Sequence, residues 1–372
     1  MKVPFYDATR EYGLYKAEFD KAVTDVMESG AFILGEQVRD FEEAVCGYTG
    51  ARYAVGVANG SDALLIASDI LGFKRSAEVI TPTFTFFASA SCIARLDGVP
   101  VFCDVDEDTF CMDMGDVENR ITDKTRGILS VHLFLQTADM SKCMELAEKH
   151  GLAVLEDAAE AFGMATAYKG ESRHAGLVGD FGVFSFFPTK TLGGYGDGGM
   201  IVTDDEDLYK KAKSYRVHGA SKKYHHDYIG YNSRLDTLQA AVLKVKLSRI
   251  DDGIQKRARL AAQYREMLKD VAGVKLPVVK DDNKEVNYVF CLQAEKRDAL
   301  QDCLSSKGIG TTVYYPVPLH LQKCFEYLGY RKGDFPVSER LCGTVLALPM
   351  FPELTEAEVS FVCESIREFY LK

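Results

Sequence analysis

The chain has 372 residues, 47% of them hydrophobic, and a formal net charge of −11 at pH 7. Single hydrophobic cores stop growing near about 250 to 300 residues, so we expect a large and a small domain. The acidic balance argues against a general binder of nucleic acid or of anionic membranes, although a local pocket can still hold phosphate. No apolar run approaches about 18 residues and the N-terminus has no signal-peptide core, so we expect a cytoplasmic protein.

Ten cysteines are scattered singly along the chain. They form no C-x-x-C pair and have no histidine at the spacing of a metal site. We therefore interpret them as reduced thiols and predict no bound metal.

Short apolar runs alternate with amphipathic stretches in the first half of the chain. Strands are predicted at residues 52–58, 78–81, 101–105, 126–131, 152–156 and 181–187. Helices are predicted between several of them, at 61–71, 87–96 and 141–150. This alternation predicts an α/β fold, in which helices cover both faces of a mostly parallel sheet. Ligands of such sheets bind beyond the carboxyl ends of the strands.

The second half contains fewer strands and longer helices. A helix is predicted to open near Ser233, where S-R-L-D resembles a capping box with aspartate in place of glutamate. A charge-rich helix follows at 253–270, then a strand at 286–292 and helices at 297–307 and 355–370. These elements suit a small α+β domain. We place the large domain at residues 1–250 and the small C-terminal domain at residues 251–372.

Lys190 lies in the segment 179–199, GDFGVFSFFPTKTLGGYGDGG. It follows a predicted buried strand that stops at Pro188, and five glycines come shortly after it. Such a backbone bends sharply or lets a ligand come near. A lysine there could form a Schiff base, whereas composition alone favours a solvated surface lysine.

Two loops carry residues suited to phosphate. Gly60 and Ser61 lie at a turn from strand to helix, where free N–H groups and the helix dipole attract anions. The alternative is that Ser61 only caps the helix. Ser185, in the strand before Lys190, could reach the same phosphate.

Two further loops carry residues suited to a planar cationic ring. Phe86, in TPTFTFF, could stack on such a ring, although a core position is the simpler interpretation. Glu156 and Asp157 end a buried strand, where a carboxylate is costly unless it meets a cation. Asp157 could keep a heteroaromatic nitrogen protonated, as a pyridinium cofactor requires, or it could simply cap the next turn.

Six segments resemble, in order and spacing, the pyridoxal-phosphate nucleotide-sugar aminotransferases of the DegT/StrS group. They are NGSDAL, TPTFTFF, EDAAEAFG, the Lys190 segment, HGASKKYHHDYIGYNSRLDTLQAA and YYPVPLHLQ. The resemblance runs through nearly the whole chain. It implies the type I aminotransferase fold, pyridoxal 5′-phosphate as cofactor (alternating with its pyridoxamine form), and a homodimer with shared active sites. It also implies L-glutamate as amino donor and a nucleotide-linked keto sugar as acceptor.

The resemblance also implies the cofactor contacts. Lys190 is the Schiff-base lysine, which moves the proton between the amino-acid Cα and the cofactor in both half-reactions. Asp157 is the partner of the pyridine nitrogen, and Phe86 stacks on the ring. The phosphate is held by Gly60, Ser61 and Ser185, with Asn232 reaching it from the other subunit.

Substrate contacts are implied at three places. Arg234, together with Tyr224, His225 and His226, faces the sugar or the donor from across the dimer interface. His320, in the YYPVPLHLQ loop, is expected to contact the substrate, with a plain surface residue as the alternative.

Two positions depart from the pattern of the group. Glu160 stands where glutamine or histidine usually contacts the phenolic oxygen of the cofactor, so a carboxylate there must be protonated, turned away or tolerated. Leu135 stands where glycine is common, so we expect a narrower loop after His132.

The acceptor is predicted from the motif around Asn232. The form HG-x₄-YHH-x₃-GYNSRLDTLQAA resembles members that aminate 3-keto nucleotide sugars for surface polysaccharides. UDP-2-acetamido-2-deoxy-3-keto-glucuronate is the leading candidate, and a dTDP-3-keto-6-deoxyhexose is the alternative. A hypothesis of another class is a regulatory protein that binds the cofactor without turnover, for which Glu160 is the only hint.

Overall fold

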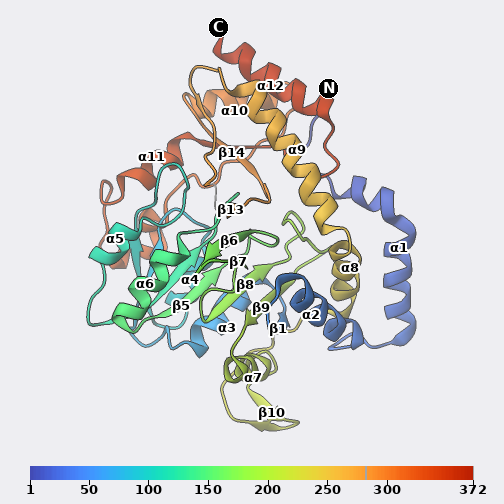
Figure 1. Ribbon diagram of the computed structural model, residues 1–372, viewed down its shortest axis with the longest axis vertical. Helices are drawn as coiled ribbons and strands as arrows, with labels where there is room; N and C mark the ends of the chain where they lie inside the picture. The colour runs from blue at the N-terminus through green and yellow to red at the C-terminus, as the bar shows by residue number, and fades with distance from the viewer. Residues whose placement is uncertain (281–282, 372) are drawn as a thin grey trace.

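The computed structural model describes residues 1–280 and 283–371. A seven-stranded sheet in the order β1-β9-β8-β5-β4-β2-β3 forms its centre (Figure 1). β9 runs antiparallel to both of its neighbours, and the other pairs are parallel. The strands are β1 (Tyr53–Val57), β2 (Glu78–Pro82), β3 (Val99–Cys103), β4 (Thr125–Val131), β5 (Ala153–Asp157), β8 (Phe181–Ser185) and β9 (Gly199–Thr203).

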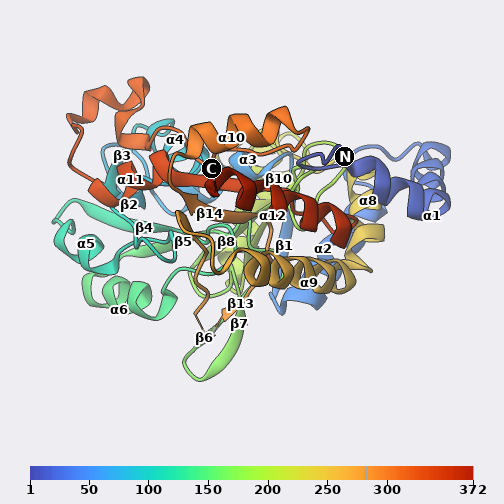
Figure 2. The same ribbon diagram turned by 90° about the horizontal axis from the view of Figure 1, so that it is seen from above.

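Helices cover both faces of this sheet, which confirms the predicted α/β architecture. Neighbouring strand residues point to opposite faces, so Leu155 packs in the core beside α3 and α4 while Val154 packs in the core beside α6. Figure 2 shows α4 and α6 on opposite sides of β4 and β5. The helices of this part are α1 (Ala8–Ser29), α2 (Glu36–Thr49), α3 (Gly60–Ile70), α4 (Ala88–Ala94), α5 (Met114–Asn119), α6 (Met140–His150), α7 (Glu206–Tyr215) and α8 (Thr237–Leu247).

The C-terminal third builds a second core. Tyr264, Leu292 and Val362 are buried in it, between a small antiparallel sheet and its helices. α9 begins at Ile250, close to the predicted domain boundary, and runs from the large sheet to this core (Figure 1). The elements are α9 (Ile250–Leu268), β12 (Val274–Lys275), β14 (Phe290–Ala294), α10 (Arg297–Ser306), η1 (Leu319–Leu321), η2 (Lys323–Leu328), α11 (Pro336–Thr344), β15 (Val345–Leu348) and α12 (Glu356–Tyr370).

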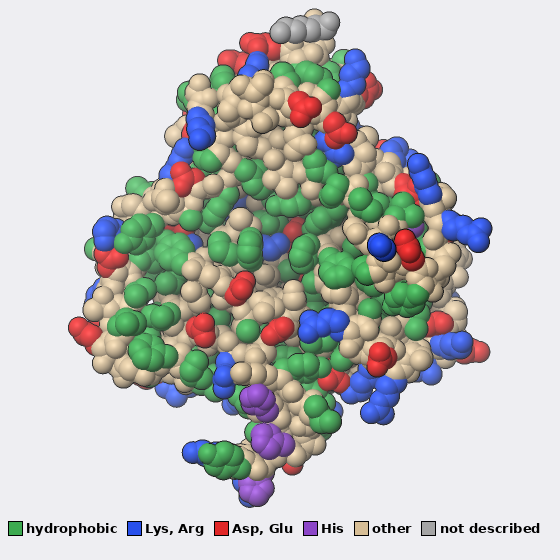
Figure 3. Space-filling model, turned by 180° about the vertical axis from the view of Figure 1, so that it is seen from behind, with side chains coloured by type: hydrophobic (Ala, Val, Ile, Leu, Met, Phe, Trp, Pro, Cys, Tyr) green, Lys and Arg blue, Asp and Glu red, His purple; other side chains and the backbone are tan. Residues whose placement is uncertain are grey.

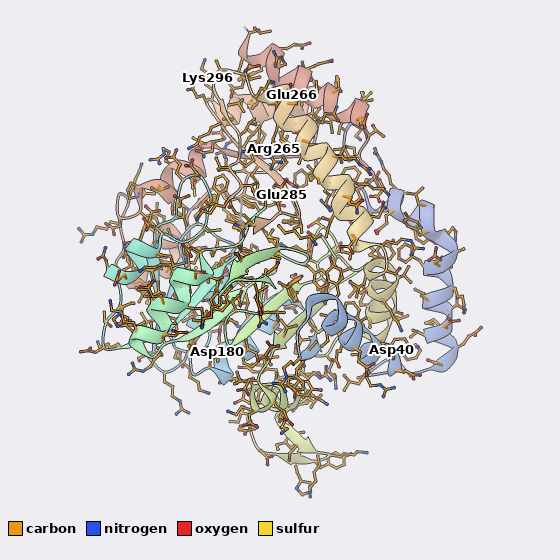
Figure 4. The ribbon with its side chains drawn as sticks, in the orientation of Figure 1. Asp40, Asp180, Arg265, Glu266, Glu285 and Lys296 are labelled. Atoms are coloured by element: carbon orange, nitrogen blue, oxygen red, sulfur yellow. The ribbon has the colours of Figure 1, made fainter. Side chains whose placement is uncertain are left out.

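Side-chain bonds fix segments that are distant in sequence. On α9, Arg265 pairs with Glu285 through two N···O contacts of 3.1 and 2.7 Å (Figure 4). Asp180 accepts a hydrogen bond of 2.7 Å from the backbone N–H of Val154 and so fixes the start of β5. The bond from Val154 helps to hold β5, the strand that ends at Asp157.

Two small sheets lie outside the main one. β6 (Ala165–Tyr168), β7 (Glu171–His174) and β13 (Asn283–Lys284) form one. β10 (Ala220–Lys222) and β11 (His225–His226) form a hairpin that projects from the molecule below α7 (Figure 1). Among the helices of the described residues, none is long and apolar enough to cross a membrane.

Two sequence predictions about local structure are wrong. α8 begins at Thr237 after Asp236, and Ser233 caps no helix, because its Oγ accepts the backbone N–H of Ala58 at 3.1 Å. The strand expected from residue 286 begins only at Phe290. The carbonyl groups of residues 287 and 288 bind the buried guanidinium of Arg257 instead of a neighbouring strand.

Candidate active site

A cavity of about 400 Å³ opens at the carboxyl ends of the parallel strands. Loops after β1, β2, β4, β5 and β8 line it, and three tyrosines from the C-terminal third close one side. It brings together seven of the residues predicted from the sequence, namely Gly60, Ser61, Phe86, Asp157, Glu160, Ser185 and Lys190. Their roles remain predictions, and all seven line the same cavity.

Lys190 lies in the turn after β8, where its backbone N–H donates to the carbonyl of Phe187 at 2.8 Å. Its Nζ lies 3.0 Å from a carboxylate oxygen of Glu160 and 4.4 Å from the centre of the Tyr288 ring. The side chain is only 15% exposed, so the interpretation as a solvated surface lysine is wrong. Burial lowers the pKa of Lys190, but the Glu160 carboxylate and Tyr288 outweigh it, so that the pKa lies above its ordinary value.

Asp157 ends β5 at the floor of the cavity and is 5% exposed. Its carboxylate accepts hydrogen bonds from Ser89 Oγ at 2.7 Å and from the Ala159 N–H at 3.2 Å. Burial raises the pKa of Asp157, and these bonds and the charge of Lys190 only partly oppose the rise. Among the ion pairs of the described residues Asp157 has no cationic partner within 4.0 Å. A protonated ring nitrogen would supply the cationic partner that Asp157 lacks within the described part of the chain.

The start of α3 forms a polar cradle. The side chain of Asn59 caps the helix by accepting the N–H of Asp62 at 2.8 Å, and the N–H groups of Gly60 and Ser61 belong to the first, unpaired turn. A Cβ on Gly60 would lie 2.7 Å from Cβ of Ser185, so these two elements approach closely only because residue 60 is glycine. Such a cradle fits a phosphate group.

Phe86 and Glu160 line the cavity from other loops. Phe86 is 57% exposed, so the alternative of a core position is wrong. The Glu160 side chain is 8% exposed and faces Lys190, and its second oxygen accepts the N–H of Phe134 at 3.0 Å. Glu160 is therefore not turned away but serves as the partner of the lysine in this structure.

Asn232, predicted to reach the phosphate, and four of the predicted substrate residues lie outside the larger cavity. Asn232 and Arg234 line a neighbouring open cavity of about 470 Å³, and Asp197 lines both cavities. Tyr224, His225 and His226 are exposed on the β10–β11 hairpin, which carries histidine side chains on its surface in Figure 3. Within one chain none of these five residues lines the larger cavity, and their predicted roles stay predictions.

His320 is 2% exposed, so the interpretation as a surface residue is wrong. Its Nδ1 lies 2.8 Å from Thr83 Oγ1 and its Nε2 lies 3.2 Å from Glu339. The side chain links the loop after β2 to the C-terminal third and does not line the cavity. A substrate contact stays a prediction.

Glu156 and His132 form a buried pair beneath the cavity. Glu156 is fully buried and lies 2.8 Å from Nε2 of His132. It also accepts three backbone N–H groups, from Gly176, Val178 and Gly179. Burial raises the pKa of Glu156, but the bonds to its charged form outweigh burial and lower it. Glu156 is thus a structural carboxylate, unlike its neighbour Asp157.

The loop after His132 is fixed by contacts from the C-terminal third of the chain. Leu135 is fully buried, and the amide of Gln136 donates to the Val278 carbonyl at 2.6 Å and accepts the Lys280 N–H at 3.3 Å. Tyr288, Tyr314 and Tyr315, which line the cavity, were missed as site residues. The Y-Y-P run was a signal for the last two, since it belongs to a motif of the resemblance, whereas Tyr288 lies in a stretch that the sequence predicts as strand.

A match to a sequence profile identifies the family of this chain. The profile of the DegT/DnrJ/EryC1/StrS aminotransferase family matches residues 14–367. The chain belongs to this family. Membership confirms the predicted class of enzyme, an aminotransferase, and its cofactor, pyridoxal 5′-phosphate.

Three relatives of this DegT/StrS-family aminotransferase show what it is similar to. The "pleiotropic regulatory protein" of Geobacillus stearothermophilus is 45% identical, covering 100% of this chain and 99% of that protein. A UDP-N-acetyl-3-dehydro-α-D-glucosamine 3-aminotransferase of Acidithiobacillus ferrooxidans is 40% identical over 98% and 97%. A UDP-2-acetamido-2-deoxy-3-oxo-D-glucuronate aminotransferase of Pseudomonas aeruginosa is 37% identical over 98% and 99%.

A solved structure matches the whole fold. The Streptomyces venezuelae protein DesV superposes with a TM-score of 0.96 at 38% identity, covering 100% of this chain and 99% of DesV. This likeness confirms the predicted type I aminotransferase fold.

Proposed function

We propose that this aminotransferase moves the amino group of L-glutamate to the 3-keto carbon of a nucleotide-linked sugar. The observation that carries the proposal is the presence of Lys190 and Asp157 in one cavity, beside the polar cradle at the start of α3. The printed names of the relatives from Acidithiobacillus and Pseudomonas support position 3 and a UDP-linked sugar.

The cofactor, when bound, supplies an electron sink and carries the amino group between the two substrates. The chain supplies its orientation. The cradle of Gly60, Ser61 and Ser185 would hold the phosphate, and Asp157 would hold a proton on the ring nitrogen. Phe86 would cover one face of the ring. Together these five residues would fix the plane and the direction of the cofactor with respect to Lys190.

Lys190 would move the proton that leaves the amino-acid Cα, because its Nζ is the basic group that faces the cavity. Tyr288 packs against the lysine, and its hydroxyl lies 3.2 Å from Thr189 Oγ1. These contacts restrict the lysine to a small region at the cavity wall. The same lysine serves both half-reactions, as the sequence predicts.

The leading acceptor remains UDP-2-acetamido-2-deoxy-3-keto-glucuronate, and a dTDP-3-keto-6-deoxyhexose remains the alternative. A uronate carboxylate would suit Arg234, which has a planar two-pronged donor group. The carboxylates of L-glutamate, the amino donor, would suit Arg234 equally well. A measured acceptor is therefore needed to separate these two roles.

A homodimer is part of the proposal. Asn232 and Arg234 lie outside the larger cavity of their own chain. Tyr224 in the hairpin below α7 is 83% exposed, and Ile229, which follows the hairpin, is 96% exposed. Large exposed apolar side chains of this kind mark contact surfaces. A second subunit that covers them would bring Asn232 to the phosphate cradle of its neighbour.

The test is the absorbance of the protein with added pyridoxal phosphate, before and after L-glutamate, followed by a set of keto sugars. We expect a band that requires Lys190, that glutamate converts, and that the correct 3-keto sugar restores. Lys190→Ala should lose the band, whereas Lys296→Ala, at an exposed lysine of the C-terminal third, should keep it (Figure 4). No lysine-dependent band would refute the proposal.

A regulatory role is the second candidate, favoured by the printed name of the relative from Geobacillus. A regulator that binds the cofactor without turnover would form the band but leave it unchanged with glutamate. Because Lys190, Asp157 and the cradle are all present in one cavity, we expect turnover. The glutamate step of the same experiment separates the two.

A further inference from the structure

Glu160 makes two contacts that fix its carboxylate within the cavity. One oxygen lies 3.0 Å from Lys190 Nζ, and the other accepts the N–H of Phe134 at 3.0 Å. Both partners come from loops that line or border the cavity, after β8 and β4. With the Glu160 side chain 8% exposed and that of Lys190 15% exposed, the ion pair is largely shielded from water. A shielded pair is stronger than a surface pair.

The surroundings of Lys190 contain no competing anion at the same distance. Among the described residues Glu160 is the one carboxylate within 4.0 Å of Nζ. Asp157 also acts on Lys190 electrostatically, but its oxygens are bonded to Ser89 and Ala159. The other titratable groups that line the cavity are His132, Asp197, Tyr288, Tyr314 and Tyr315. Burial raises the pKa of Tyr314 and Tyr315 above the ordinary value of a phenol, so these two side chains stay neutral near pH 7.

We propose that Glu160 is a positioning residue that holds Lys190 as an ammonium ion, directed into the cavity, until a carbonyl compound displaces the carboxylate. The inference rests on the proposed function for the role of Lys190 as the cofactor lysine. An ammonium nitrogen has no lone pair, so Lys190 must release one proton before it can attack any carbon. The pair therefore makes the free site slow toward stray electrophiles. A cofactor that brings its own anionic oxygen to this position can replace Glu160 as the partner of the lysine.

Glutamine at this position would act differently. Its carbonyl oxygen could still accept the N–H of Phe134, and its NH₂ group would then point at Lys190. Two donors facing each other disfavour the ammonium form. Glu160→Gln is thus a nearly isosteric change that removes the charge and keeps the anchor on the loop after β4.

The experiment measures how acylation of Lys190 by acetic anhydride depends on pH, in the full-length chain freed of cofactor. Lys296, which is exposed at the start of α10 (Figure 4) and does not line the cavity, is read in the same digest as the internal standard. We expect the midpoint of the Lys190 curve to lie above that of Lys296. A midpoint at or below that of Lys296 in the unmutated protein overturns the proposal, and this outcome needs no variant.

Glu160→Gln should speed the acylation of Lys190 at pH 8 by about tenfold, which corresponds to one pH unit in the midpoint. Asp197→Asn removes a carboxylate at the rim of the same cavity without touching Lys190, and should change the rate less than about twofold. An unchanged rate in Glu160→Gln overturns the proposal. Glu160→Asp keeps the charge and serves as a second variant, which should label more slowly than Glu160→Gln.

The labelling needs neither glutamate nor sugar, so it is independent of turnover. If the lysine-dependent band with pyridoxal phosphate fails to form while the labelling behaves as expected, the proposed function falls and the ion pair stands. If glutamate converts the band while Lys190 labels like a surface lysine, only the inference about Glu160 falls.

Discussion

At the scale of single residues, Asp157 is placed for binding at the expense of stability. Its carboxylate is buried with two hydrogen bonds but no cation within 4.0 Å among the described ion pairs. Burial raises the pKa of Asp157 in the folded state. Ionising this group near pH 7 therefore costs the folded, cofactor-free protein free energy. A bound cation would remove that cost.

Asp157→Asn should make the cofactor-free protein more stable at pH 7, on the order of 1 kcal/mol, and weaken cofactor binding. The gain should shrink as pH falls below about 4, because the aspartate is then protonated in both folded and unfolded chains. Urea unfolding at pH 7 and at pH 3.5 measures both values. If the variant is less stable at pH 7, the hydrogen bonds to Asp157 fully offset the free-energy cost of burying its charge.

Gly60 lies so close to Ser185 that a side chain at this position would clash. A Cβ there would lie 2.7 Å from Cβ and 3.1 Å from Oγ of Ser185. We expect Gly60→Ala to push α3 away from β8, to cost about 1 to 3 kcal/mol of stability and to weaken cofactor binding at least about tenfold. Equilibrium titration with pyridoxal phosphate and thermal unfolding measure these effects.

The matched control is Gly47→Ala in α2, where nothing lies within 4 Å of an added Cβ. Alanine favours a helix interior over glycine, so this variant should be stabilised by about 0.5 to 1 kcal/mol with unchanged cofactor affinity. Equal affinities in both variants would contradict a role of the cradle in phosphate binding.

At the scale of elements, an ion pair joins the first and last helices. Arg10 of α1 donates two hydrogen bonds, of 2.8 and 2.7 Å, to Glu358 of α12. Glu358 also completes the capping box of α12 by accepting the N–H of Thr355. The bond from Arg10 is the main cause that lowers the pKa of Glu358 to about 2. The pair therefore stabilises the junction of the two helices while the carboxylate is charged.

Arg10→Gln should lower the free energy of unfolding by about 1 to 2 kcal/mol at pH 7. Because the folded pKa of Glu358 is depressed, this contribution is present above the unfolded value near 4.3 and is lost as pH falls through about 2. Unfolding by denaturant between pH 7 and pH 3 should show the difference shrinking. Arg39→Gln, at an exposed pair with Glu36, should change stability by less than about 0.5 kcal/mol.

The elements also show what sequence patterns can and cannot reveal. β5 is predicted within a residue or two because its apolar run stops at a carboxylate pair, and α3 is predicted from its amphipathic pattern. The alternative in which Ser61 caps α3 is wrong, because Asn59 is the cap. Ser233 resembled a helix cap but binds Ala58 of another loop. Tyr288 was expected in a strand but lies against Lys190. The errors at Ser233 and Tyr288 concern long-range partners, which local periodicity does not encode.

At the scale of the whole molecule, the predicted site residues of one chain are divided between two cavities. Lys190, Asp157 and the cradle line the larger cavity, while Asn232 and Arg234 line the other. The hairpin below α7 holds the predicted substrate residues Tyr224, His225 and His226 away from both. The sequence assigned all of them to one active site only through the resemblance, because neither spacing nor burial within one chain reveals a neighbouring subunit.

A shared site can be tested by mixing two defective chains. Lys190→Ala removes the lysine, and Asn232→Asp places a negative charge where the phosphate contact is predicted, so each variant alone should be nearly inactive. In a heterodimer one site would carry both defects and the other would carry none. Two-fold symmetry of the dimer thus predicts about half of the unmutated activity for heterodimers purified through two different tags.

If each site were instead built from a single chain, every site of the heterodimer would carry one defect, and the mixture would stay inactive. The control pairs Lys190→Ala with Asp157→Asn. Both residues line the same cavity of one chain, so this heterodimer should not recover in either case. Recovery with Asn232→Asp but not with Asp157→Asn therefore separates residues that belong to one subunit from those that cross the interface. Failure of both pairs, with dimers present by sedimentation, would place Asn232 within its own subunit's site.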